Sequence, residues 1–282
     1  MNYQWYPGHM TKAKRMMEEN IKLIDLVIEI VDARIPISSR NPDIDSLAVN
    51  KARIILLNKS DLADDKITNQ WINYFNENNI YCLKLNSRNN SGIKQVNGLI
   101  MTACADKIER NKQRGILNRP IRAMVVGIPN VGKSTFINSY AGKASAKTGN
   151  KPGVTKGKQW IKLNKNVELL DTPGILPMSY PTREQAVRLA LLGTMKEEVL
   201  PTLELSYSLL DFLKVAYPSS LFSRFGMENI ASMDNDSILV RIAQRRLLLD
   251  GSQPSIDKAA YLLVKEFKDG VLGRLSLECP CA

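Results

Sequence analysis

Residues 121–135 read IRAMVVGIPNVGKST, and this stretch decides the fold. The apolar run at 121–126 predicts a buried strand, and the motif G-x4-G-K-[ST] follows it at Gly127–Ser134. Glycines let backbone N–H groups wrap phosphates, Lys133 can neutralise the β- and γ-phosphates, and the Ser134 hydroxyl can bind Mg²⁺. The expected phosphate-binding residues are Asn130, Val131, Gly132, Lys133, Ser134 and Thr135.

A second phosphate-binding element, Asp171–Gly174 (DTPG), follows the short strand predicted at 167–170. A carboxylate at a strand end can hold Mg²⁺ through water, so we expect Asp171 to do this. The N–H of Gly174 can bind the γ-phosphate. Thr155 lies between the two elements and can supply a second Mg²⁺ ligand.

A base-recognition element, Asn58–Asp61 (NKSD), follows the strand predicted at 53–57. The Asp61 carboxylate can accept hydrogen bonds from N1–H and the exocyclic amino group of guanine, and the Lys59 stem can pack along the base. Adenine presents an acceptor at N1 and lacks that amino group, so Asp61 argues against ATP. The expected base-binding residues are Asn58, Lys59 and Asp61, with Asn86 and Ser87 after a third strand at 81–85.

The order of these elements predicts a circularly permuted GTPase domain. The NKSD motif comes about seventy residues before the phosphate-binding loop, although the base motif comes last in the usual GTPase order. The same pocket can still form, because a site depends on spatial arrangement and not on chain order. In this order the DTPG segment leads directly into the C-terminal region.

Hydrophobic periodicity predicts two domains, with a boundary at residue 180. Residues 1–180 alternate strands and helices, which is typical of an α/β domain with a largely parallel sheet. Residues 181–282 form a smaller, all-helical domain in this prediction. Helices are expected at 11–22, 67–78, 93–107 (followed by a basic linker, 109–119), from 133, after the capping box Thr182–Gln185, and at 203–216, 236–249 (N-cap Asp236) and 255–268 (N-cap Ser255).

Composition excludes two classes of protein. The chain has 282 residues, 44% hydrophobic and 24% charged, which is typical of a globular protein and excludes general disorder. No run reaches the roughly 18 apolar residues of a membrane span. Four cysteines in a chain of this length do not indicate a disulfide framework, and no signal-peptide pattern is present, so we expect a cytoplasmic protein.

The charge is unevenly distributed. The net charge is +11, and residues 107–166 contain 14 basic residues and one acidic residue. Such a stretch is typical of a surface that binds a polyanion such as a nucleic acid, although a solvated surface is the alternative. Residues 181–282 carry a net charge of −1.

The chain resembles the circularly permuted GTPases of the YlqF/YawG family over almost its whole length. The motifs that carry the resemblance are Trp5–Met10 (WYPGHM), Asp32–Pro36 (DARIP), Gly127–Thr135 and the NKSD and DTPG elements. The resemblance implies a Mg²⁺-dependent GTP hydrolase that binds the maturing 50S ribosomal subunit, contacts 23S rRNA and is released on hydrolysis during late assembly. It also implies that the C-terminal domain binds RNA or the ribosome.

The resemblance also implies slow hydrolysis without a partner. Ile175 and Leu176 stand where many GTPases have a glutamine that orients the attacking water, and the family is known for such hydrophobic replacement. His9, the only histidine, is our hypothetical water-orienting residue; the alternative is that it anchors the N-terminal turn or contacts RNA. Asn130 stands where related GTPases hold K⁺, which is a second hypothesis.

Two other functions remain open from the sequence. One is an RNA-binding scaffold whose nucleotide site is regulatory, and the other is a GTPase of another RNA pathway, such as tRNA modification. Turnover stimulated by the ribosomal particle would separate these from the first interpretation. We expect a monomer without a membrane partner, since no strong heptad pattern is present.

Overall fold

The structure is a computed structural model that describes residues 15–117, 119–142, 159–163, 165–172, 182–194 and 200–280. The chain divides into two compact units, Thr182–Leu277 (unit 2) and the rest of the chain (unit 1). Unit 1 therefore includes the last residues, Glu278–Ala282, as well as Met1–Pro181. The sequence predicts a boundary at residue 180 and does not predict this return of the chain.

Unit 1 is built on a six-stranded sheet. The strand order is β3 (Tyr81–Lys84), β2 (Ala52–Asn58), β1 (Leu26–Asp32), β4 (Ile121–Val126), β6 (Val167–Asp171) and β5 (Gln159–Lys162). Strand β5 is antiparallel to β6, and all other neighbours are parallel. The predicted α/β domain with a largely parallel sheet is confirmed.

The sheet has its topological switch point between β1 and β4. From β1 the chain adds β2 and β3 on one side, and then crosses to place β4 on the other side of β1. All seven residues of β1 are buried, as expected for a central parallel strand covered on both faces. Ligands of open α/β sheets bind at the carboxyl ends of the strands at such a switch point, so the candidate site is expected there.

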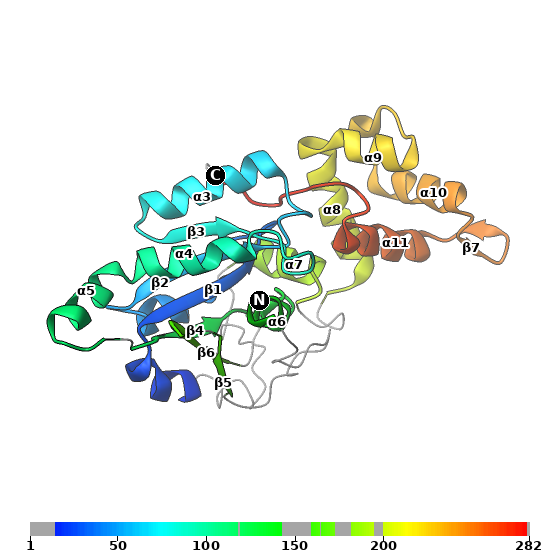
Figure 1. Cartoon of the computed structure of the whole chain (residues 1–282). Helices are drawn as coiled ribbons and strands as arrows, with labels where there is room; N and C mark the ends of the chain where they lie inside the picture. Colours follow the sequence, from blue (N-terminus) through cyan, green and yellow to red (C-terminus); the bar gives the residue numbers. More distant parts are fainter. Residues whose placement is uncertain are drawn as a thin grey trace. The chain divides into compact units, whose positions relative to one another are not determined.

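Helices cover the sheet and pack against it through hydrophobic side chains. They are η1 (Ile21–Leu23), α2 (Asp43–Leu47), α3 (Asp65–Glu77), α4 (Ile93–Ala103), α5 (Ala105–Gln113) and α6 (Lys133–Ala141), and residues 15–20 are also helical. Trp71 and Phe75 of α3 pack with Val31 of β1 and Leu57 of β2. Helix α4 contacts β2 and β3, and Figure 1 shows its axis running roughly along the strands.

Two helix predictions in unit 1 are wrong in detail. The helix expected at 93–107 is interrupted at Cys104, and the first part of the expected basic linker, residues 109–113, is helical as part of α5. Helix α5 has Asp106 in its first turn and Arg110 and Lys112 in its last, which is the favourable arrangement of charges for the helix dipole. The expected helix at 11–22 is helical at 15–20 and tightens into η1, while residues 11–14 lie outside the described residues.

Unit 2 is mostly helical. Its elements are α7 (Arg183–Leu191), α8 (Thr202–Ala216), α9 (Pro218–Phe225), η3 (Ile230–Ser232), α10 (Asn235–Arg246), β7 (Leu249–Asp250), β8 (Gln253–Pro254) and α11 (Ile256–Asp269). Two predicted N-caps are confirmed: Thr182 accepts from the N–H of Gln185, and Ser255 accepts from that of Lys258. No helix within the described ranges is long and apolar enough to cross a membrane.

The predicted helix at 236–249 is wrong at both ends. Its N-cap is Asp234, and the helix ends where Leu247 adopts a left-handed conformation with φ of 54°. The following residues form the small antiparallel pair of β7 and β8, so unit 2 is not entirely helical. Helix α9 is not predicted at all; it begins with Pro218, which is favourable at a first helical position.

Candidate nucleotide site

The predicted motifs gather at one edge of the sheet in unit 1. The NKSD segment begins at the end of β2, the Asn86 segment follows β3, the phosphate-binding loop follows β4, and Asp171 ends β6. These four strands are parallel, so their carboxyl ends lie at the same edge. The permuted chain therefore brings its separated motifs together.

The loop after β4 has the backbone of a phosphate cradle. Asn130 and Gly132 have positive φ angles of 65° and 93°, so the chain turns sharply before α6 begins at Lys133. No side chain within the described residues caps the N-terminus of α6. The free N–H groups and the helix dipole favour an anion at this point. Ser134 and Thr135 lie in the first turn and are half-buried.

Lys133 joins this loop to the end of β6. Its Nζ atom lies 2.7 Å from Oδ1 of Asp171, and both side chains are buried. The adjacent hydroxyl of Thr172 donates to the carbonyl of Val125 in β4, with 2.8 Å between the oxygens. The predicted phosphate cation and the predicted metal-binding carboxylate are therefore in direct contact. The donors available here, a carboxylate and the Ser134 hydroxyl, are the oxygen ligands that Mg²⁺ prefers.

The side chain of Asn58 links three loops by hydrogen bonds. Its Nδ2 donates to the carbonyl of Val131 in the phosphate-binding loop at 2.7 Å. Its Oδ1 accepts from the N–H of Ser87 at 3.0 Å and from the Ser87 hydroxyl at 2.9 Å. This buried amide thus fixes the base-recognition loop against both of its neighbours.

The rest of the NKSD loop is a tight turn. Lys59 has a φ of 58°, and its carbonyl accepts from the N–H of Leu62 at 2.9 Å. The Lys59 Nζ atom lies 3.0 Å from Oδ2 of Asp32. Asp61 is exposed, so its carboxylate is accessible to a base.

The segment after β3 is also held from two sides. Asn86 is buried, and its Oδ1 accepts from the N–H of Arg88 at 2.8 Å. The hydroxyl of Ser139, in α6, donates to the carbonyl of Ser87 at 2.5 Å. Both predicted residues are therefore fixed beside the NKSD loop.

Three predicted site residues, His9, Thr155 and Gly174, lie outside the described residues. The structure also adds residues that the sequence prediction did not place at the site, above all Asp32 and Ser139. Asp32 was visible as part of the DARIP motif, and its position at the end of a strand next to β2 was the signal that could have found it.

A phosphate cradle, a Lys–Asp pair and an NKSD turn on a parallel sheet define a P-loop GTPase with a permuted order of motifs. A family model described as a 50S ribosome-binding GTPase matches residues 122–207. Proteins named ribosome biogenesis GTPase A are 42% identical in Bacillus cereus and 43% identical in Priestia megaterium, in both cases over 99% of this chain and over 95% and 98% of those proteins. The chain therefore belongs to the ribosome biogenesis GTPase A family.

Solved structures agree with this assignment. The crystal structure of GNP-bound YlqF from T. maritima matches with a TM-score of 0.66 and 29% identity, over 95% of this chain and 98% of that one. The GDP-bound structure of the same protein matches with a TM-score of 0.67. The predicted circularly permuted P-loop GTPase fold is thus confirmed, whereas the C-terminal domain that the sequence predicts to be all-helical also contains the β7–β8 pair.

Proposed function

We propose that this GTPase binds the maturing 50S ribosomal subunit, contacts 23S rRNA and is released when GTP is hydrolysed. The observation that carries the nucleotide-binding part of the proposal is that Asn58 links the phosphate-binding loop, the NKSD loop and the Asn86 segment. Relatives named for ribosome biogenesis support the ribosomal part. A mitochondrial ribosome-associated GTPase 1 of Bos taurus, 31% identical over 98% of this chain, supports it too.

GTP binding in this proposal divides between two ends of the site. At the base end, Asp61 accepts from the N1–H and amino group of guanine, and the Lys59 stem lies along the ring. At the phosphate end, the N–H groups of residues 130–135 surround the phosphates and Lys133 neutralises their charge. Asn86 and Ser87 support the base loop, and Gly174 donates its N–H to the γ-phosphate.

The metal part of the proposal rests on oxygen donors. Ser134 and Thr155 would hold Mg²⁺ directly, and Asp171 would hold it through water. When bound, Mg²⁺ screens the charge that accumulates on the phosphates during transfer. The chain itself pairs the Asp171 carboxylate with the Lys133 amino group at 2.7 Å, so the residue that would face the metal also orients the lysine.

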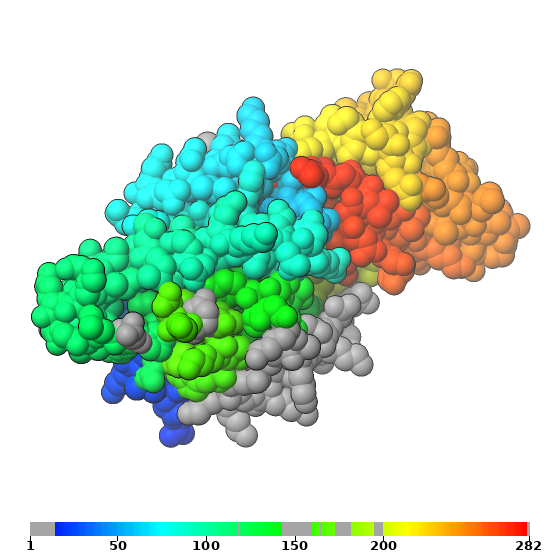
Figure 2. Space-filling model, in the orientation of Figure 1, coloured from blue at the N-terminus to red at the C-terminus, as the bar shows by residue number. Residues whose placement is uncertain are grey.

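Binding to the particle uses basic surfaces in both units. In unit 1, Arg110, Lys112 and Arg114 are exposed on or just after α5, which forms an end of the unit (Figure 2). In unit 2, Arg241 and Arg245 line a hollow of about 470 Å³ with residues 226–229. The neighbouring Arg246 does not line the hollow and instead donates to the carbonyl of Arg224. Such contacts with rRNA phosphates make binding salt-dependent.

The proposal predicts that 50S subunits stimulate GTP hydrolysis by the full-length protein by at least about tenfold, while ATP is not hydrolysed. The measurement is phosphate release with and without 50S subunits, in KCl and in NaCl. A faster rate in KCl supports K⁺ binding at Asn130, and equal rates contradict it. Tight GTP binding without stimulation favours the second candidate, an RNA-binding scaffold with a regulatory nucleotide site.

His9→Ala is expected to lower the 50S-stimulated rate about 100-fold, which is a common loss when a residue that moves or orients a proton is removed. GTP affinity should stay unchanged, because the imidazole acts on water and not on the nucleotide in this proposal. The neighbouring variant Met10→Ala serves as the control. Full stimulated turnover in His9→Ala would exclude the role.

A further inference from the structure

Asp32, the last residue of β1, is a buried carboxylate that the nucleotide-binding roles above do not use. It is paired in register with Asn58, the first residue of the NKSD motif. The next N–H, that of Ala33, donates to the carbonyl of Asn58 at 2.9 Å. Asp32 is thus fixed beside the start of the base-recognition loop.

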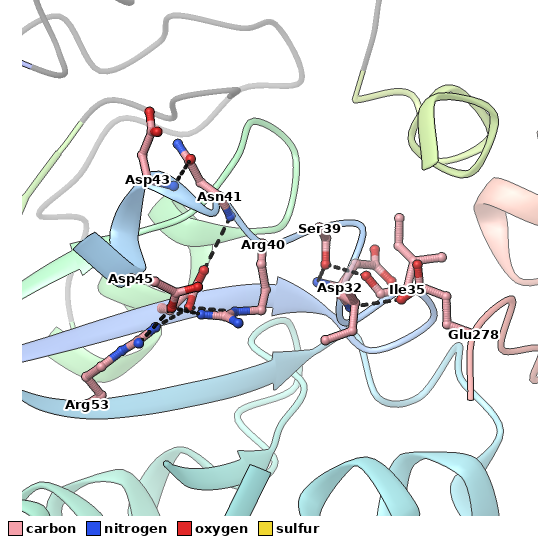
Figure 3. A network of polar contacts seen from close by, with 11 residues as sticks. Asp32, Ile35, Ser39, Arg40, Asn41, Asp43, Asp45, Arg53 and Glu278 are labelled. Carbon is pink, nitrogen blue, oxygen red and sulfur yellow. Dashed lines mark hydrogen bonds and ion pairs between the residues drawn. The ribbon is translucent and has the colours of Figure 1, made fainter. Parts of the chain in front are cut away.

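The orientation of the Asp32 carboxylate is fixed by Arg34. The Nε and backbone N–H of Arg34 both donate to Oδ1, at 2.9 Å and 3.1 Å, and Nη2 donates to Oδ2 at 3.0 Å. A bidentate guanidinium contact of this kind is strongly directional. The Asp32 N–H in turn donates to the hydroxyl of Ser39 at 3.0 Å, and Figure 3 shows these two residues together at the end of the strand.

The carboxylate presents its second oxygen to Lys59. Oδ2 of Asp32 lies 3.0 Å from the Lys59 Nζ atom. Burial alone would raise the pKa of Asp32, but the adjacent Arg34 and Lys59 cations outweigh it and lower the pKa well below its usual range. Asp32 therefore stays charged at neutral pH, where its carboxylate attracts the lysine amino group.

An anchored amino group restricts the lysine stem. Lys59 has four side-chain torsions, and a stem that moves among rotamers loses entropy when a base packs on it. The backbone of Lys59 is held in the left-handed region, and its tip is held by Asp32, so both ends of the stem are fixed before a ligand arrives. Ordering the stem in advance strengthens binding.

We propose that Asp32, oriented by Arg34, is a positioning residue. It holds the Lys59 side chain in the orientation in which its stem packs along the guanine base. This inference rests on the proposed binding of a guanine nucleotide at the NKSD loop. It assigns the DARIP motif a task in base recognition, although Asp32 itself acts only through Lys59.

The first test is Asp32→Asn in the full-length protein, with binding of a fluorescent GDP analogue as the readout. The dissociation constant is expected to rise about tenfold, or about 1.4 kcal/mol. The matched control is Glu29→Gln: Glu29 lies on the same strand, is equally buried and also pairs with arginines, Arg40 and Arg53, but not with Lys59. This control should leave GDP affinity unchanged.

A double-mutant cycle with Lys59→Met separates positioning from general support of the fold. Met keeps an apolar stem but lacks the amino group that Asp32 holds. If Asp32 acts through Lys59, Asp32→Asn has no further effect on affinity in the Lys59→Met background. A carboxylate that only stabilises unit 1 would give additive losses.

Additive losses, or wild-type GDP affinity in Lys59→Met, overturn the inference. Lys59→Met keeps the Asp32–Arg34 pair, so it can still overturn the inference even if Asp32→Asn does not fold. Failure of the wild-type protein to bind the GDP analogue overturns the proposed function instead, and the two failures are therefore distinguishable.

Discussion

Gly132→Ala is expected to lower GTP affinity at least about 100-fold, which corresponds to about 2.7 kcal/mol. A Cβ atom at this position would lie 2.3 Å from the Nδ2 atom of Asn58, and the backbone φ of 93° is unfavourable for alanine. Asn58 cannot move away cheaply, because it is buried and holds Val131 and Ser87. One added methyl group therefore disturbs the phosphate-binding loop and both base-side loops.

The matched control for this prediction is Gly142→Ala at the other end of α6. Gly142 also has a positive φ, 65°, but a Cβ atom there would meet none of the described residues within 4 Å. It should cost about 1–2 kcal/mol in stability from the backbone alone, with little effect on GTP binding. Titration of a fluorescent GTP analogue and thermal unfolding of both variants separate the two effects. Equal GTP affinity in the two variants would show that the contact with Asn58 is unimportant.

The parts of the fold that the sequence predicted are those with strong local signals. The strands at 53–57 and 121–126 are short apolar runs, and both are central parallel strands whose burial demands such runs. The phosphate-binding loop was found because its glycines and lysine have a fixed spacing. The helix expected at 236–249 was wrong at its end because Leu247, not a glycine, adopts the left-handed conformation that terminates it.

The parts of the candidate site that the sequence did not reveal depend on pairs far apart in the chain. Asn58 and Val131 are 73 residues apart in the chain, and no periodic pattern in the sequence predicts their contact. The residue types of Asn58 and Lys59 were recognised, but their packing partners were not. The sequence predicted that the stem of Lys59 packs along the base. It did not predict that Asp32 holds the amino group of Lys59. A motif therefore predicts what a residue can do, and only the fold shows what keeps it in place.

The second large effect, on local stability, is expected from replacing Glu278. This residue belongs to unit 1, although it follows unit 2 in the chain. Its carboxylate accepts from the N–H groups of Ile37 and Ser38, at 2.8 Å and 3.1 Å, and from the Ser38 hydroxyl. Its carbonyl accepts from Nε1 of Trp71 at 3.2 Å. Glu278→Ala removes the acceptor of the buried Ser38 N–H and of the partly buried Ile37 N–H, so we expect a loss of about 2–4 kcal/mol in local stability.

Hydrogen exchange measures the loss of local stability at the amides of Ile37 and Ser38 themselves. In Glu278→Ala the amides of Ile37 and Ser38 are expected to exchange at least about 30-fold faster, the equivalent of about 2 kcal/mol. Glu278→Gln keeps one oxygen acceptor and should fall between this variant and the wild type. The control is Glu266→Ala, which removes a similarly buried glutamate paired with Arg224 in unit 2 and should leave both amides unchanged.

Removing residues 278–282 extends the argument, because it also deletes the carbonyl that Trp71 contacts. Exchange at Ile37 and Ser38 should then be faster than in Glu278→Ala. These two residues directly precede Ser39, whose hydroxyl accepts from the N–H of Asp32. If the exchange rates in all three Glu278 variants equal that of the wild type, the loop after β1 is stable by itself and the tail does not support it. If the rates rise in the expected order, the end of the chain stabilises the segment that orients Asp32.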